Sequence, residues 1–240
     1  MPGERRFSAE TDAVRYATPA RLADHIAPRR PENDPSLEQF LMQSGSLAYQ
    51  SATVGRIFEG RSVLFLGDDD HVSVIAAAFY DLTVIVYEVD PRVADSLRGW
   101  ASRLSLRNYR VVVSDIRSIE REAGQPAGAF YINPPFSSKN GGHGLRYWVS
   151  KALQLCTPTC EGIVVMPANE DLDWVNHNWV SVQRFLSDNG CRILSVGEDQ
   201  LQTYDGTNDE GMRSQNLHVR RIDPSRVREE PMRGGENLYR

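Results

Sequence analysis

Two short stretches with chemically useful side chains follow apolar runs of the chain. Gly67-Asp68-Asp69-Asp70 comes directly after the apolar residues 63–66, and Asn133-Pro134-Pro135-Phe136 ends the apolar run that starts at residue 128. Ligands of open parallel sheets bind beyond the carboxyl ends of the strands, where such loops meet. Three neighbouring carboxylates favour a cationic ligand and repel a ligand carboxylate by roughly 1–4 kcal/mol per close pair. One or two of these acids can instead face the following helix or solvent.

The Asn133-Pro134-Pro135-Phe136 stretch has the composition of a rigid hydrogen-bonding loop. Two prolines stiffen it, so the Asn133 side chain and the Pro134 carbonyl can accept hydrogen bonds from one amine. The Phe136 ring offers a surface for stacking or a cation–π contact. The simpler alternative is a strand that ends in a Pro-Pro turn. The sequence favours a loop that orients the lone pair of an amine nitrogen.

Acids also follow the second and third apolar runs. Glu88 and Asp90 precede Pro91 and a helical pattern, where a carboxylate can accept both hydroxyls of a ribose. We predict that Glu88 makes this contact, with Asp90 as the second candidate. Asp115 occupies the same position after the third run and can bind the exocyclic amine of adenine. Each of these acids can instead cap the helix that follows it.

The loop after the fifth apolar run is acidic and carries an aromatic residue. Glu170, Asp171, Asp173 and Trp174 lie within it, and ten acidic residues stand against two arginines between residues 160 and 210. Ammonium groups bind carboxylates and aromatic faces, so we predict that these four residues contact an extended polyamine. An exposed, solvated loop is the alternative.

Apolar runs and helical patterns alternate from residue 61 onward. Strands are expected at residues 63–66, 83–90, 109–115, 128–136, 162–167, 191–198 and 214–223, and longer helices at 71–81, 91–104, 144–156 and 176–190. Continuously apolar strands separated by helices indicate a parallel sheet covered on both faces. Only a loop separates the last two strands, which predicts an antiparallel hairpin. The pattern is that of an α/β, Rossmann-like class I methyltransferase fold with a seven-stranded, mostly parallel sheet.

Three regions are expected along the chain. Residues 1–58 form an N-terminal helical segment and linker, residues 59–223 the catalytic domain, and residues 224–240 a polar tail. Asp34-Pro35-Ser36 should start a helix that runs to Glu59-Gly60, with a possible break at Gly45.

Composition narrows the possible partners. The net charge is −5 and the pI is about 5.6, which argues against a duplex nucleic acid held mainly through its phosphates. No run approaches the roughly 18 apolar residues of a membrane helix, and no signal peptide is evident, so a cytoplasmic protein without membrane contact is expected. Cys156 and Cys160 lack the further His or Cys pair of a four-ligand zinc site, so no metal is expected.

The two loops together resemble those of a known family. Gly67-Asp68-Asp69-Asp70 after the first strand and a (D/N)PP(Y/F) loop after the fourth are similar to the branched-chain polyamine synthases, or bis(aminopropyl)spermidine synthases, over roughly residues 40–222. The resemblance implies transfer of aminopropyl groups from decarboxylated S-adenosylmethionine to an internal amine of spermidine. It implies that Asp68, Asp69 and Asp70 line the polyamine and sulfonium site, with Gly67 beside the cofactor.

The same resemblance implies individual roles. Asp70 is the candidate to deprotonate or orient the amine, Glu88 holds the ribose and Asp115 the adenine. The sequence departs from the family at Asn133, where that loop begins with Asp. An amide cannot act as a base, so a base must come from the three aspartates, or the reaction needs only orientation of a neutral amine.

The departure leaves other functions open. A methyltransferase that uses S-adenosylmethionine on an amino group of a nucleobase or protein fits the Asn133 loop, and would bring a nucleic acid or protein partner. A binding protein that kept the fold and lost the chemistry is a third possibility. A homo-oligomer is compatible with all three.

Overall fold

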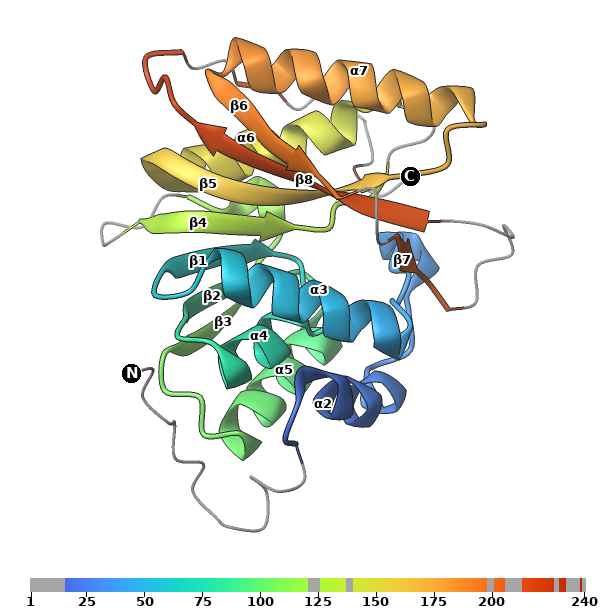
Figure 1. Ribbon diagram of the computed structural model, residues 1–240, viewed down its shortest axis with the longest axis vertical. Coiled ribbons are helices and arrows are strands. Elements are labelled where there is room, and N and C mark those ends of the chain that lie inside the picture. Colours follow the sequence, from blue (N-terminus) through green and yellow to red (C-terminus); the bar gives the residue numbers. More distant parts are fainter. Residues whose placement is uncertain are drawn as a thin grey trace.

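The computed structural model describes residues 16–120, 126–136, 140–197, 201–205, 213–226, 229–231 and 238. Strands and helices alternate from residue 62 onward, as the sequence predicts (Figure 1). The strands are β1 (Ser62–Leu66), β2 (Thr83–Glu88), β3 (Tyr109–Val113), β4 (Ala127–Ile132), β5 (Cys156–Pro167), β6 (Cys191–Val196), β7 (Gln202–Thr203) and β8 (Arg213–Arg221). The α-helices are α2 (Pro19–Ile26), α3 (Ser44–Ile57), α4 (Val72–Phe79), α5 (Pro91–Arg103), α6 (His143–Leu155) and α7 (Asp173–Asp188). Short 3-10 helices are η1 (Ala27–Arg29), η2 (Pro35–Leu37) and η3 (Ile116–Ser118).

The described strands form one mixed sheet. Their order is β3-β2-β1-β4-β5-β8-β6, and β7 pairs with β8. Strands β1 to β5 run parallel, whereas β8 is antiparallel to both β5 and β6. The predicted parallel sheet with a C-terminal antiparallel hairpin is therefore confirmed. The sheet has eight strands rather than the predicted seven, because β7 has only two polar residues and gives no strand pattern in the sequence.

Helices cover both faces of the sheet and create two hydrophobic clusters. Side chains alternate along β1, so Phe65 packs toward α2, α3, α4 and α5, while Leu64 packs toward α6 and α7. Figure 1 shows α3 and α4 in front of the strands and α7 over the far end of the sheet. Burial on both faces explains the continuous apolar runs from which the strands were predicted.

The chain order reverses between β1 and β4, which are neighbours in the sheet. At such a switch point the loops on either side separate and leave a crevice at the carboxyl ends of the strands. The loop that starts at Gly67 follows β1, and the loop that starts at Asn133 follows β4. The topology therefore brings together the two stretches that the sequence marks as reactive.

The N-terminal region contains the main departure from the predicted elements. A helix starting at residue 35 is wrong: η2 ends at Leu37, Glu38 is left-handed with φ of 53°, and α3 begins only at Ser44. Asp34 caps η2, as predicted for a helix start, by accepting from the Ser36 backbone. The Gln39 side chain donates to Asp90, and the Met42 backbone donates to Asp70. These hydrogen bonds to distant acids keep the residues between η2 and α3 out of a helix.

Smaller departures concern where elements begin. β5 starts at Cys156 rather than at residue 162, with an irregular register against β4 between Ala127 and Ala129. α7 starts at Asp173 rather than at residue 176. In the tail, Glu230 pairs with Arg146 on α6. The boundaries placed at residues 58 and 223 remain predictions.

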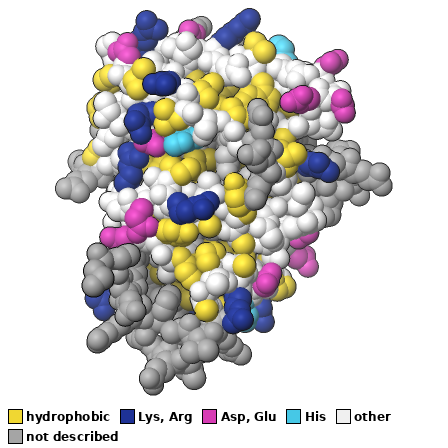
Figure 2. Space-filling view, in the orientation of Figure 1, with side chains coloured by type: hydrophobic (Ala, Val, Ile, Leu, Met, Phe, Trp, Pro, Cys, Tyr) yellow, Lys and Arg dark blue, Asp and Glu magenta, His cyan; other side chains and the backbone are white. Residues whose placement is uncertain are grey.

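Two features of the described residues bear on possible membrane or nucleic-acid partners. None of the described helices combines the length and apolar character needed to cross a bilayer. On the face shown in Figure 2, the basic and acidic side chains that are drawn in colour are interspersed with hydrophobic ones. A duplex nucleic acid needs a continuous basic surface, which this face does not offer among its described residues.

Close packing between β4 and β5 generates a test of the fold. A Cβ added at Gly162 would lie 2.1–2.3 Å from ring atoms of Phe130, whereas a Cβ at Gly128 would meet no atom within 4 Å. We expect Gly162→Ala to lower the free energy of unfolding by about 1–3 kcal/mol, because the buried ring has to move. Gly128→Ala is the matched strand control and should have little effect. Urea unfolding measures both, and equal effects would contradict this packing.

Candidate active site

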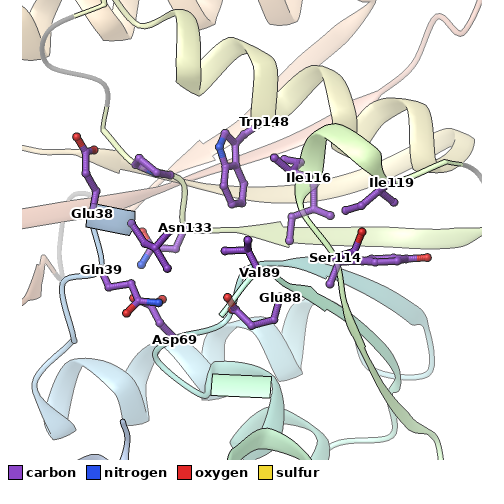
Figure 3. Close-up of a pocket in the computed structure, with 15 residues that line it drawn as sticks. Glu38, Gln39, Asp69, Glu88, Val89, Ser114, Ile116, Ile119, Asn133 and Trp148 are labelled. Atoms are coloured by element: carbon purple, nitrogen blue, oxygen red, sulfur yellow. The ribbon is translucent and has the colours of Figure 1, made fainter. Parts of the chain in front are cut away.

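A pocket opens at the carboxyl ends of β1, β2, β3 and β4, where the topology predicts it. It encloses about 530 Å³, including its mouth. Its lining comes from the residues after these strands, from the segment after η2, and from α6. Figure 3 shows Glu88, Val89, Ser114, Ile116 and Ile119 toward one side, and Glu38, Gln39, Asp69 and Asn133 toward the other. We call these the nucleoside half and the acceptor half, from the chemistry that each can support.

The nucleoside half is mainly apolar, with one carboxylate. Val89, Ile116 and Ile119 offer hydrocarbon surface to a flat heterocycle, and the Glu88 carboxylate lies between them and Asp69 (Figure 3). Glu88 is only 3% exposed, and burial raises the pKa of its carboxyl. Its two oxygens accept the backbone N–H groups of Asp68 and Asp90, each at 2.9 Å. Each oxygen keeps a further lone pair, so the carboxylate can still accept two hydroxyl groups.

The first loop is shaped by Gly67. This residue has a φ of +68°, which few other residues adopt, and its N–H donates to the Tyr87 carbonyl at 2.7 Å. A Cβ added here would lie 3.4 Å from the Trp148 ring, which forms the opposite wall. The glycine thus sets the turn that separates the two halves of the pocket.

The three aspartates of this loop have three different environments. Asp68 is buried and accepts from the backbone of Val72 and Ser73 at 2.9 and 3.1 Å, so it caps α4 and does not line the pocket. Asp69 is half-buried and does line the pocket. Burial, together with the nearby charges of Asp70, Glu88 and Asp68, raises its pKa well above the usual value. Asp69 is therefore the carboxylate of this loop that a ligand can reach.

Asp70 is turned away from the pocket into a buried hydrogen-bonding network. It is 2% exposed, and one oxygen accepts from the Arg30 guanidinium at 3.0 Å and from the Met42 backbone at 2.6 Å. The other oxygen accepts from the Asn133 side-chain amide at 3.1 Å. Burial raises the pKa of the Asp70 carboxyl, and the Arg30 charge opposes the rise. We expected this residue to act directly on the amine, but the structure places it behind Asn133.

The Asn133 loop presents one polar group to the pocket. Because the Asn133 Nδ2 donates to Asp70, its amide oxygen is left to accept a hydrogen bond. Pro134 is buried outside the lining, whereas Pro135 contributes to it. The Phe136 ring does not line the pocket and packs edge-on against Tyr204 with ring centroids 6.4 Å apart. The structure thus places Asn133 in the pocket lining and Phe136 outside it, against Tyr204.

Two of the predicted nucleoside ligands act as helix caps. Asp90 accepts from the Arg92 backbone at 2.9 Å, and Asp115 accepts from the Arg117 backbone at 2.8 Å. Burial would raise the pKa of Asp90, but hydrogen bonds from Arg92 and Gln39 lower it overall. Hydrogen bonds from Arg117 lower the pKa of Asp115. Neither carboxylate lines the pocket, although the neighbouring Val89, Ser114 and Ile116 do.

The acidic loop after β5 does not reach the described pocket lining. Glu170, Asp171 and Asp173 are exposed, and Asp173 lies in the first turn of α7. Trp174 is half-buried and also lies outside the lining. The structure therefore does not bring these four residues to the carboxylate of Asp69. Within the described residues, no cluster of His, Cys, Asp and Glu has the arrangement of a metal site.

Sequence reasoning missed the wall contributed by the N-terminal segment. Leu37, Glu38 and Gln39 line the pocket, and Gln39 donates to Asp90 at 3.3 Å. These residues lie in a stretch read as helix, so no local pattern marks them. Arg30 and Trp148 were also missed, because each acts through contacts with distant parts of the chain.

The sheet order and the pocket at the switch point are those of the class I fold of S-adenosylmethionine-dependent methyltransferases. A family model of the branched-chain polyamine synthase A C-terminal domain matches residues 21–230. The chain therefore belongs to the branched-chain polyamine synthase family. A search of curated proteins found no match.

Solved structures support the same fold. A mutein of the Thermus thermophilus branched-chain polyamine synthase, in complex with N4-aminopropylspermidine and 5'-methylthioadenosine, is 24% identical, with a TM-score of 0.71, and the match covers 100% of this chain and 74% of that one. The Thermus thermophilus branched-chain polyamine synthase itself, in complex with the same two ligands, is 23% identical, with a TM-score of 0.69. The match covers 97% of this chain and 75% of that one. A proposed RNA methyltransferase from Pyrococcus horikoshii is 16% identical, with a TM-score of 0.63 and coverage of 84% and 98%.

The buried ion pair between Arg30 and Asp70 predicts a large stability effect. Asp70→Asn leaves the Arg30 guanidinium without its charged partner in a buried site, so we expect a loss of about 3–5 kcal/mol in the free energy of unfolding. Asp95→Asn is the matched control, because Asp95 forms an exposed pair with Arg98 at 2.9 Å. Its effect should stay within about 0.5 kcal/mol. Similar losses for both variants in urea unfolding would show that Asp70 does not hold this region together.

Proposed function

We propose that the protein transfers an aminopropyl group from decarboxylated S-adenosylmethionine to an amine nitrogen of a polyamine. The observation that carries this proposal is that the carboxylate of Asp69 lines the pocket and lies near three further acidic groups, those of Asp68, Asp70 and Glu88. Such surroundings favour a ligand that carries only positive charges over one that also carries a carboxylate. Membership of the family supports the proposal, as do the polyamine and the methylthioadenosine bound to the Thermus thermophilus enzyme.

The nucleoside half fits the nucleoside of this co-substrate. Val89, Ile116 and Ile119 provide an apolar surface for adenine, and Glu88 has lone pairs for both ribose hydroxyls. Asp90 and Asp115 contribute indirectly, because their caps fix the loops that carry Val89 and Ile116. When bound, the sulfonium nucleoside supplies an electrophilic carbon next to a good leaving group.

The acceptor half fits an amine that is held for in-line attack. The Asn133 oxygen and the Asp69 carboxylate can each accept a hydrogen bond from a neutral amine nitrogen. A primary amine can donate to both and a secondary amine to one, and in either case the lone pair is left for the electrophilic carbon. As the N–C bond forms, the C–S bond breaks, the sulfur leaves as a neutral thioether, and Asp69 accepts the proton released by the nitrogen. A raised pKa brings Asp69 closer to the range in which a carboxylate is an effective base.

One observation supports a second candidate function. The residue before Pro134 is an amide rather than an acid, and this loop also suits the orientation of a planar amino group on a nucleobase or protein. Intact S-adenosylmethionine would then supply a methyl group. The two candidates differ in whether the ligand above Asp69 has a carboxylate. For either activity we place the protein in the cytoplasm.

The deciding experiment compares the two co-substrates. We expect the protein with decarboxylated S-adenosylmethionine and spermidine to yield methylthioadenosine and an aminopropylated polyamine, detected by mass spectrometry. Calorimetry should show tighter binding of the decarboxylated form than of the intact one. Tighter binding of the intact form, together with methyl transfer to an amine, would establish the second function. Binding of neither form would overturn both.

Asp69→Asn separates catalysis from stability. We expect the variant to lose most of its turnover and to keep its affinity for methylthioadenosine, since the ribose contact is unchanged. In the wild type, turnover should fall as the pH drops through the raised pKa of Asp69, because protonation removes the acceptor of the amine proton.

The same variant should be more stable than the wild type at neutral pH. A carboxyl whose pKa is raised by folding stabilises the folded state below its unfolded pKa and loses that contribution as the pH rises through the folded value. The amide avoids this loss, so its melting temperature should exceed that of the wild type at pH 7, and the difference should shrink toward acid pH. Asp24→Asn, at an exposed position on α2, is the control. If Asp69→Asn keeps full turnover, Asp69 does not take part in the mechanism.

A further inference from the structure

A buried histidine directly follows the three aspartates. His71 is 0% exposed and begins α4 from a left-handed conformation with φ of 66°. Glycine and asparagine adopt this conformation more readily than histidine does. A requirement for backbone shape alone would therefore be met better by another residue, which directs attention to what the imidazole contacts.

Both nitrogens of the His71 ring have partners. Nδ1 lies 3.0 Å from the carbonyl oxygen of Asp69, and Nε2 lies 2.8 Å from the hydroxyl of Ser96. A carbonyl oxygen only accepts, so Nδ1 must carry the hydrogen and Nε2 must accept from Ser96 in the neutral ring. Burial lowers the pKa of His71 to about 4, so the ring is neutral near pH 7. The hydrogen bonds therefore specify a single tautomer.

These contacts connect the two loops that form the two halves of the pocket. Asp69 belongs to the loop after β1, whereas Ser96 is on α5, the helix that follows Glu88 and its loop after β2. Backbone and side chain leave the same Cα, so the direction of the Asp69 carboxylate depends on where its peptide carbonyl is held. In the structure that carbonyl is held by His71, and the carboxylate lines the acceptor half.

We propose that His71 is a positioning residue that keeps the Asp69 carboxylate aimed at the acceptor amine by holding the Asp69 carbonyl against α5. The inference rests on the proposed function, in which Asp69 receives the amine proton. His71 itself does not line the pocket and acts through its contact with the Asp69 carbonyl.

Two substitutions isolate the hydrogen bond from the backbone conformation. His71→Gly and His71→Asn both tolerate a positive φ, but only asparagine places a side-chain N–H where Nδ1 stands. We expect His71→Gly to lower kcat roughly 10- to 100-fold, the scale of effect caused by a small displacement of a reacting group. We expect His71→Asn to stay within about threefold of the wild type.

The affinity for methylthioadenosine distinguishes positioning from a general structural role. Both variants should keep this affinity and differ in kcat, because the thioether nucleoside does not use the Asp69 carboxylate. Equal kcat values for the two variants, or a wild-type kcat in His71→Gly, would overturn the proposal. If the wild type transfers methyl rather than aminopropyl groups, the proposed function fails, and the same kcat comparison on the methyl acceptor still decides the role of His71.

A measurement on the wild type covers the case in which His71→Gly does not fold. The ¹⁵N chemical shifts of the imidazole report its tautomer. We expect a neutral ring with the hydrogen on Nδ1 at pH 7. A hydrogen on Nε2 would leave the Asp69 carbonyl without its donor and would contradict the proposal.

Discussion

The buried ion pair between Arg30 and Asp70 is the interaction on which the arrangement of the pocket depends. Removing both charges from water is costly, and the cost is offset only where further hydrogen bonds satisfy the same groups. Here Asp70 accepts from Arg30, from the Met42 backbone and from Asn133, which belong to three separate parts of the chain. One carboxylate thus fixes the N-terminal segment, the residues just before α3 and the loop after β4 relative to the first loop. The N-terminal wall of the pocket exists because this network holds it in place.

Besides Asp68, which caps α4, five acids at the strand ends divide into two groups. Asp70, Asp90 and Asp115 are neutralised by arginines of the same chain and maintain the loops. Asp69 and Glu88 keep their carboxylates at the pocket and are raised in pKa by burial and by their neighbours. The first group therefore fastens the structure, and in the proposed function the second group receives a cation. The unpaired charges of the second group cost stability, which is expected where a site keeps uncompensated charge.

Much of this could be predicted from the sequence, and the failures have a physical cause. The parallel sheet, the hairpin and the two reactive loops follow from apolar runs and from the loop composition, which are local signals. Glu88 lies in the pocket, as expected, because its position at the end of β2 is fixed by topology, and its contact with a ribose stays a prediction. Which of three adjacent aspartates faces the ligand depends on backbone angles at single residues, and the sequence contains no signal for it. The roles of Arg30, Gln39 and Trp148 depend on contacts between distant parts of the chain. Such contacts also explain why the helix predicted from residue 35 does not form and residues 37–39 line the pocket instead.

A double-substitution cycle on Arg30 and Asp70, followed by calorimetry with methylthioadenosine, tests most directly whether this network builds the pocket. The variants are Arg30→Met, Asp70→Asn and the two combined, compared at a temperature at which all three are folded. If the ion pair acts as one unit, each single substitution lowers the affinity for methylthioadenosine. The combined variant then binds at least as tightly as the single variant with the lower affinity. Losses that add up in the combined variant, or wild-type affinity in all three, would contradict the account.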